Sequence, residues 1–177
     1  VLPIYSTDNT IVNQFNYSTY HSFLENYVFG VKFLFQSANS ITGEDIRVSK
    51  RLFIPNTDAQ LAKEDEWCCF ILGEIDETSL YVMRRHYDLK EIYGGSKTVP
   101  NACRDYLKRQ FEGIAEYLED KDYIMKEGFG ICDIFLISCL DWAIFYEFEL
   151  TKNMTKYRDD IINRPAYSKA MDINYST

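Results

Sequence analysis

The side chains that most often carry chemistry, cysteine and histidine, have no spacing typical of a catalytic or metal site. The five cysteines are Cys68, Cys69, Cys103, Cys132 and Cys139. Because the number is odd, two are adjacent and no pair has Cys-x-x-Cys spacing, we expect free thiols in the cytoplasm or another reducing compartment, such as the mitochondrial matrix. Neither His21 nor His86 has another histidine or a cysteine at helical spacing, so we expect no metal site.

The composition is that of a globular, acidic protein. Of 177 residues, 46% are hydrophobic, and glycine and proline number 8 and 4. This length is sufficient for one domain, or for one domain and a shortened second one. With 19 Lys and Arg against 27 Asp and Glu, the formal net charge is −8, which disfavours nucleic acid as a partner.

The longest apolar stretch, 129–148, predicts a buried helix. It contains three carboxylates, Asp133, Asp141 and Glu147. Carboxylates at this density would be costly in lipid, so we do not expect a membrane span. Apolar residues lie on nearly every side of this helix, which is typical of the central helix of a bundle.

The chain divides into two unlike parts, 1–54 and 55–177. In the first part, Leu2–Ser6 and Tyr27–Phe35 are rich in aromatic and β-branched residues and flank an amphipathic stretch at Ile11–Asn26, which favours a β-α-β arrangement. Helical patterns dominate the second part. Helices are expected there over 58–86, 100–118, 131–148, 154–162 and 165–173, with a break at 93–96.

Four segments of the second part occur in a characteristic order. They are Asp65–His86, Gly130–Leu136 (Gly-Ile-Cys-Asp-Ile-Phe-Leu), Leu140–Ala143 (Leu-Asp-Trp-Ala) and Tyr157–Ala170, which includes Asn-Arg-Pro-Ala-Tyr. Together they resemble the C-terminal domain of bacterial-type glutathione S-transferases, over about 55–177. This resemblance implies a mainly α fold: a glutathione-transferase C-terminal helical bundle preceded by a shortened α/β, thioredoxin-like part over 1–54.

In this family the central helix usually begins with a Ser or Thr cap that is followed three residues later by Asp. Here Asp133 is present, but Gly130 replaces the hydroxyl residue, so half of the capping box remains. The carboxylate also benefits from the positive end of the helix. We therefore expect Asp133 to be a folding determinant of the helix N-terminus rather than a catalytic residue.

The resemblance also implies a glutathione site in the first part. Gln36 and Ser37 resemble the pair that binds the γ-glutamyl carboxylate, although a plain helix cap explains Ser37 equally well. Tyr5 and Ser6 resemble the end of a first strand that provides the hydrogen-bond donor to the glutathione thiolate, although a strand ending in a turn is an alternative. Glutathione would be a co-substrate, and no cofactor is expected.

The first part departs from the family pattern. Val1–Gln36 is too short for a complete β-α-β-α-β half, and no proline corresponds to the one expected in cis before the third strand. That proline would expose the backbone groups that pair with the cysteinyl part of glutathione. Either this part has degenerated, or the chain lacks a portion of the complete protein.

Two functions remain open at this stage. The first is a transferase that binds glutathione and conjugates its thiol to small hydrophobic electrophiles. The second is a non-catalytic, transferase-like subunit that serves as a structural or protein-interaction module in a larger complex, since fold does not determine function. The resemblance implies a homodimer, and the shortened first part also allows a hetero-complex.

Overall fold

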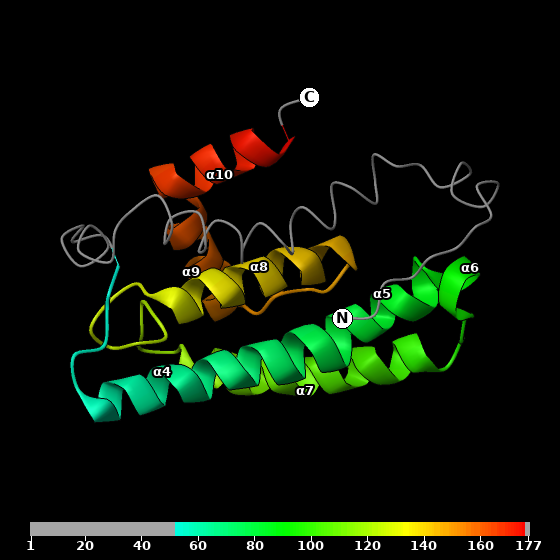
Figure 1. Ribbon diagram of the computed structural model, residues 1–177, viewed down its shortest axis with the longest axis horizontal. Coiled ribbons are helices and arrows are strands. Elements are labelled where there is room, and N and C mark those ends of the chain that lie inside the picture. The colour runs from blue at the N-terminus through cyan, green and yellow to red at the C-terminus, as the bar shows by residue number, and fades with distance from the viewer. Residues whose placement is uncertain (1–51, 176–177) are drawn as a thin grey trace, which may run out of the picture.

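The computed structural model describes residues 52–175 of the 177. The described part is a bundle of helices and contains no strand. Its elements are α4 (Asp58–Phe70), the π-helical segment η1 (Ile71–Tyr81), α5 (Val82–Tyr87), α6 (Lys90–Tyr93), α7 (Val99–Tyr117), α8 (Ile131–Phe145), α9 (Lys152–Ile162) and α10 (Pro165–Tyr175). The fold is mainly α, which confirms the fold class predicted from the sequence (Figure 1).

The first long helix runs through α4, η1 and α5 without a break, close to the predicted range of 58–86. Thr57 begins it, because its hydroxyl accepts a hydrogen bond from the Gln60 N–H at 3.2 Å. Its π-helical middle was not expected from the sequence. There the hydroxyls of Thr78 and Ser79 each donate to a carbonyl five residues earlier, at 2.7 and 2.9 Å, which fits the wider turn.

The central position of the apolar helix is confirmed. α8 packs against α4, η1 and α9, and Figure 1 shows it between the pair formed by α4 and α7 and the C-terminal helices. Asp133, Leu136 and Leu140 are completely buried. The helix ends at Phe145, three residues before the predicted end, because Glu147 adopts a positive φ of 61° and the following N–H closes back onto the Ala143 carbonyl at 3.0 Å.

The remaining helices lie close to their predicted ranges. α7 has a proline in its first turn and buries Cys103, Leu107 and Phe111 at helical spacing. The predicted break before it is present, and α6 ends at Gly94, whose φ of 81° favours glycine. Pro165 begins α10. None of the helices in residues 52–175 combines the length and the apolar character that crossing a membrane requires.

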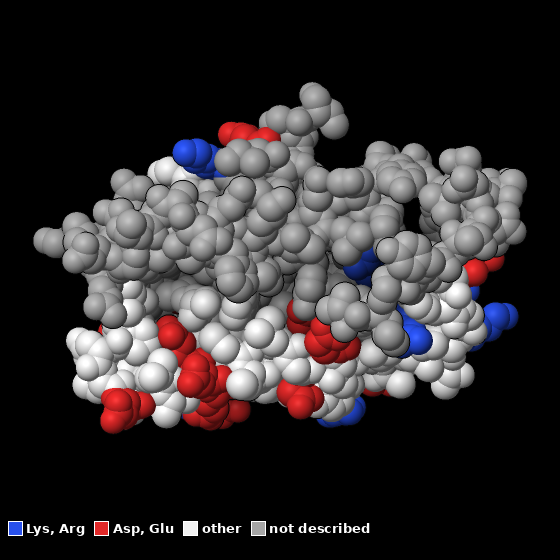
Figure 2. Space-filling model, in the orientation of Figure 1, with Lys and Arg blue, Asp and Glu red and all other residues white. Residues whose placement is uncertain are grey.

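Charge is unevenly distributed along the bundle. Four acidic residues and one lysine lie on α4, where Figure 2 shows acidic side chains gathered. Basic side chains occur at the other end of the long helix, and the last turn of α5 contains Arg84, Arg85 and His86. Arg84 is buried, and Asp88 and Glu91 lie in the same stretch as Arg85 and Lys90, so the end of the bundle near α5 and α6 has charges of both signs, whereas α4 is mainly acidic.

Candidate functional site

Of the predicted site residues, only Asp133 lies within the part of the chain that the structure describes. Tyr5, Ser6, Gln36 and Ser37 lie outside it, so their expected roles remain predictions.

Asp133 is completely buried in the first turn of α8 and accepts three hydrogen bonds. One carboxylate oxygen accepts the Gly130 N–H at 2.7 Å, which closes the helix start onto itself. The other accepts the Ile124 N–H at 2.8 Å and the Tyr157 hydroxyl at 2.6 Å. These bonds join the α7–α8 connection and α9 to the beginning of the central helix.

Burial raises the pKa of Asp133 above its usual value, and the hydrogen bonds from Tyr157, Ile124 and Gly130 oppose that rise. The carboxylate is enclosed and its bonding capacity is largely used by the protein itself. The carboxylate therefore holds the backbone at Ile124 and Gly130 in place, and no space beside it is left for a substrate. The sequence contained the capping pattern but no signal that Tyr157, 24 residues away, would be a partner.

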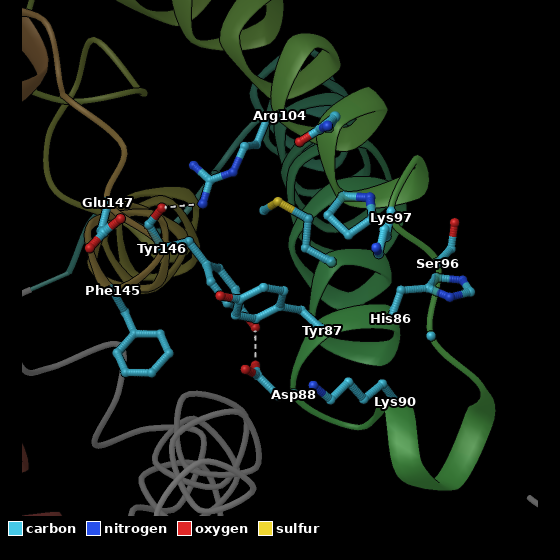
Figure 3. Close-up of a pocket in the computed structure, with 14 residues that line it drawn as sticks. His86, Tyr87, Asp88, Lys90, Ser96, Lys97, Arg104, Phe145, Tyr146 and Glu147 are labelled. Carbon is cyan, nitrogen blue, oxygen red and sulfur yellow. Dashed lines mark hydrogen bonds between the residues drawn. The ribbon is translucent and has the colours of Figure 1, made fainter.

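A cavity of about 710 Å³ lies at the opposite end of α8, between α5, the start of α7 and the residues that follow α8 (Figure 3). This volume is within the range of small-molecule sites. Met83, Tyr87, Phe145 and Tyr146 provide its apolar and aromatic surface. Its charged and ionisable lining residues are His86, Asp88, Lys90, Lys97, Arg104 and Glu147.

Tyr146 is hydrogen-bonded to two other residues that line the cavity. Its hydroxyl donates a short hydrogen bond to Asp88, and the Arg104 guanidinium donates to its backbone carbonyl at 2.7 Å. Burial and the neighbouring Asp88 raise the pKa of Tyr146 well above its usual value. The Tyr146 hydroxyl therefore orients the Asp88 carboxylate.

Two aromatic residues at the rim of the cavity are exposed. Tyr87 and Phe145 are 67% and 60% exposed, and both line the cavity. Figure 3 labels both among the residues around the cavity. Sequence patterns did not identify this site, because its two halves, 83–104 and 145–147, are brought together only by the packing of the helices.

Metal binding has no support in the described residues. Within 52–175, no three His, Cys, Asp or Glu side chains are grouped so that they could hold a metal ion. The five cysteines, all of which lie in this range, are free thiols.

Comparison with known proteins identifies the family. Residues 70–165 match the family model described as the glutathione S-transferase C-terminal domain. This match covers more than half of the 177 residues, and the chain therefore belongs to the glutathione S-transferase family, as its sequence motifs predicted.

Solved structures with the same fold are distant in sequence. A bacterial beta-class glutathione S-transferase from Sphingomonas chungbukensis superposes with a TM-score of 0.61 at 18% identity, over 71% of this chain and 60% of that one. URE2P8 from Phanerochaete chrysosporium, solved with oxidized glutathione, gives a TM-score of 0.63 at 14% identity, over 78% and 63%. Ure2p5 from the same fungus gives 0.65 at 12% identity, over 83% and 67%.

These likenesses concern the fold. The chain spans about 60% of the length of the Sphingomonas enzyme and 63% of that of URE2P8. A search of curated protein sequences gave no match.

Proposed function

We propose that this protein binds glutathione and conjugates its thiol to small hydrophobic electrophiles, and that the cavity at the end of α8 receives the electrophile. The cavity is the observation that supports this proposal: within a glutathione-transferase helical bundle, it combines aromatic walls with charged side chains of both signs. Aromatic surface suits an apolar electrophile, and polar groups around it orient the ligand.

The glutathione site belongs to the first part of the chain in this proposal. Gln36 and Ser37 bind the γ-glutamyl carboxylate, and Tyr5 or Ser6 donates a hydrogen bond that stabilises the thiolate. Because the thiolate is the nucleophile, lowering the pKa of the glutathione thiol toward neutrality is the activation step. The thiolate then attacks the electrophilic carbon, and the leaving group departs with the electrons of its bond.

Ure2p5 provides a choice of test electrophile. Its crystals contain 1-(S-glutathionyl)-2,4-dinitrobenzene, in which the glutathione sulfur is bonded to a dinitrophenyl ring. Displacement of chloride from 1-chloro-2,4-dinitrobenzene by glutathione forms this molecule. We expect the full chain to be retained on immobilised glutathione and to catalyse that displacement, followed as the absorbance of the product.

Two substitutions separate the two halves of the proposed site. Ser37→Ala should weaken glutathione binding about tenfold or more, because a charge-assisted hydrogen bond to the carboxylate is lost. Phe145→Ala should leave glutathione binding unchanged and raise the KM for the aryl halide several-fold, since its ring lines the cavity. Unchanged kinetics in both variants would remove the support for this site.

The exposed apolar side chains near the cavity also favour a second candidate, a non-catalytic subunit that binds a protein partner. Tyr87, Ile92, Ile144 and Phe145 are between 41% and 67% exposed. Aromatic residues at an exposed surface are typical anchors of protein interfaces. No retention on glutathione and no turnover would favour this candidate over the transferase.

A further inference from the structure

Two cysteine side chains from different helices meet inside the bundle. Cys68 lies on α4 and Cys132 lies in the first turn of α8, and their sulfur atoms are 3.5 Å apart. Cys132 is completely buried, whereas Cys68 is partly exposed. Cys68 is therefore the member of the pair that a small solute can approach, whereas Cys132 is shielded from solvent.

The sulfur atoms are close enough for a covalent bond to form with a small adjustment. A disulfide requires about 2.05 Å, so the two atoms must approach by about 1.5 Å. Rotation of the two cysteine side chains is the movement that this approach requires, and the polar contacts that it would break are weak thiol contacts at 3.5 Å. The other cysteines are placed differently: Cys69 is exposed, the Cys103 thiol lies 3.8 Å from the Thr78 carbonyl, and Cys139 is buried.

The hydrogen bond between the two sulfur atoms affects the two thiols differently. The Cys132 thiol can donate to the Cys68 sulfur or to the Glu64 carbonyl, each at 3.5 Å. Its hydrogen bond lowers the pKa of Cys68, although burial and the carboxylates of Glu64 and Asp65 oppose this. The same bond and burial raise the pKa of Cys132. Cys68 is therefore the thiol that ionises first, and it is also the accessible one.

We propose that Cys68 and Cys132 are an oxidative modification site, where hydrogen peroxide converts the thiol pair into a reversible disulfide that joins α4 to the start of α8. In the first step the Cys68 sulfur attacks peroxide and loses its proton. The sulfur–oxygen bond forms as the oxygen–oxygen bond breaks, which gives a sulfenic acid and water. The Cys132 sulfur then attacks the Cys68 sulfur, and hydroxide leaves and takes the Cys132 proton as a second water.

The balance is two thiols and one peroxide giving one disulfide and two waters. The thiol pair loses two electrons and the peroxide gains them. A thiol reductant, such as glutathione in excess, returns the pair to its free form by exchange through a mixed disulfide. The bond would restrain the segment between α4 and α8 and would stabilise the fold, because it closes a long loop in the unfolded chain.

The test treats the reduced full chain with about one equivalent of hydrogen peroxide and then blocks the remaining thiols. We expect the number of reactive thiols in the denatured protein to decrease from five to three, in a monomer, and the Tm to rise by about 5 °C or more. Reductant should reverse both changes. Peptide mapping without reduction should find 64–84 joined to 127–152.

Each of these two tryptic peptides contains two cysteines, Cys68 and Cys69 in the first and Cys132 and Cys139 in the second. Peptide mapping alone therefore cannot assign the bond, and cysteine variants are needed to show which sulfur atoms are joined. Cys69→Ser is the matched control, as it removes the exposed neighbour of Cys68, and it should retain the cross-link and the Tm rise. Cys68→Ser should lose both. Cys132→Ala should stop the reaction at the Cys68 sulfenic acid, which a sulfenic-acid probe would label.

Other products would overturn the proposal. These are a cross-link that survives Cys68→Ser, a disulfide between two chains through Cys69, or oxidation of exposed thiols with no bond inside the chain. If Cys132→Ala does not fold, judged by circular dichroism of the reduced protein, the partly exposed Cys68→Ser variant carries the test. The readouts are thiol counts, masses and Tm, so they do not depend on transferase activity.

Discussion

A tyrosine donates to an aspartate at each end of the central helix α8, but the two pairs have different surroundings. At the N-terminal end, Tyr157 donates to Asp133, and the completely buried carboxylate also accepts two backbone N–H groups. At the C-terminal end, Tyr146 donates to Asp88, which is exposed and lines a cavity. The Asp133 carboxylate is surrounded by protein groups that use its hydrogen-bonding capacity, whereas the Asp88 carboxylate can accept further hydrogen bonds from a ligand.

This difference indicates how the bundle separates folding from binding. The N-terminal pair fixes the start of the helix against which α4, η1 and α9 pack. The C-terminal pair, Tyr146 and Asp88, lies just beyond the end of α8, next to the exposed side chain of Phe145. Substitutions at the first end should therefore change stability, and those at the second should change ligand binding.

The largest expected effect is that of Asp133→Ala. Three buried donors, on Gly130, Ile124 and Tyr157, would lose their acceptor. We expect the free energy of unfolding to decrease by about 3–5 kcal/mol, since each unsatisfied buried donor costs about 1–3 kcal/mol. Urea unfolding followed by circular dichroism measures this change. A decrease below about 1 kcal/mol would contradict the role assigned to this carboxylate.

A smaller effect is expected for Tyr157→Phe, which removes one of the three bonds. The ring remains and packs in the core, so the expected loss is about 1–2 kcal/mol. Because the Tyr157 hydroxyl opposes the rise in the pKa of Asp133, its removal should raise that pKa further.

The loss in Tyr157→Phe should also depend on pH. The hydroxyl binds the ionised carboxylate more strongly, so the loss is largest above the folded-state pKa of Asp133 and shrinks as the pH falls through it. In the wild type, burial raises the folded-state pKa of Asp133, so protonation of this group adds stability below its unfolded pKa, and this added part is lost as the pH rises through the folded-state pKa. The hydrogen bonds to the carboxylate remain above that pKa. Urea midpoints measured from pH 4 to 8 for both proteins would test this; a pH-independent difference would contradict it.

Sequence patterns predicted the helices well and their partners less well. Apolar spacing placed the helices near 58–86, 100–118 and 131–148, because a helix must bury one face, or all faces when it is central. The π-helical turn of η1 coincides with two hydroxyls that donate to carbonyls five residues earlier, a feature that apolar spacing does not reveal. The cavity was missed because it depends on how 83–104 meets 145–147.

The same reason limited the prediction for the pairs at the two ends of α8. The capping pattern located Asp133 at a helix start, but periodicity identifies the buried face of a helix and not the side chain opposite it. Neither Tyr157 nor Asp88 could therefore be assigned from spacing. The expected glutathione residues Tyr5, Ser6, Gln36 and Ser37 were inferred from the family resemblance and await the binding experiments above.

Tyr146→Phe should have a weaker effect on stability than Tyr157→Phe. Asp88 is exposed, so water replaces the lost hydroxyl, and we expect a decrease of less than about 1 kcal/mol. Without the Tyr146 hydroxyl, the Asp88 carboxylate is no longer held in one orientation in the cavity, so the KM for the aryl halide should change at least twofold. Equal losses of stability in the two tyrosine variants would refute the contrast between the ends of the helix.

The smallest expected effect comes from restoring the missing cap at the N-terminal end. Gly130 has the extended backbone of an N-cap residue, with φ −137° and ψ −165°, which any residue adopts. A Cβ atom there would lie 3.6 Å from the Phe53 carbonyl oxygen and 3.7 Å from a Glu64 carboxylate oxygen, which are ordinary contacts. Gly130→Ser would therefore fit without strain.

The serine hydroxyl would accept the N–H of Asp133 and complete the capping box that the sequence contains only in half. We expect a gain of a few tenths of a kcal/mol, since glycine is itself a fair cap. Gly130→Ala is the matched control, because it adds the same Cβ without a hydroxyl and should not stabilise the protein. If both variants are equally stabilised in urea, the gain comes from reduced backbone freedom in the unfolded chain rather than from the cap.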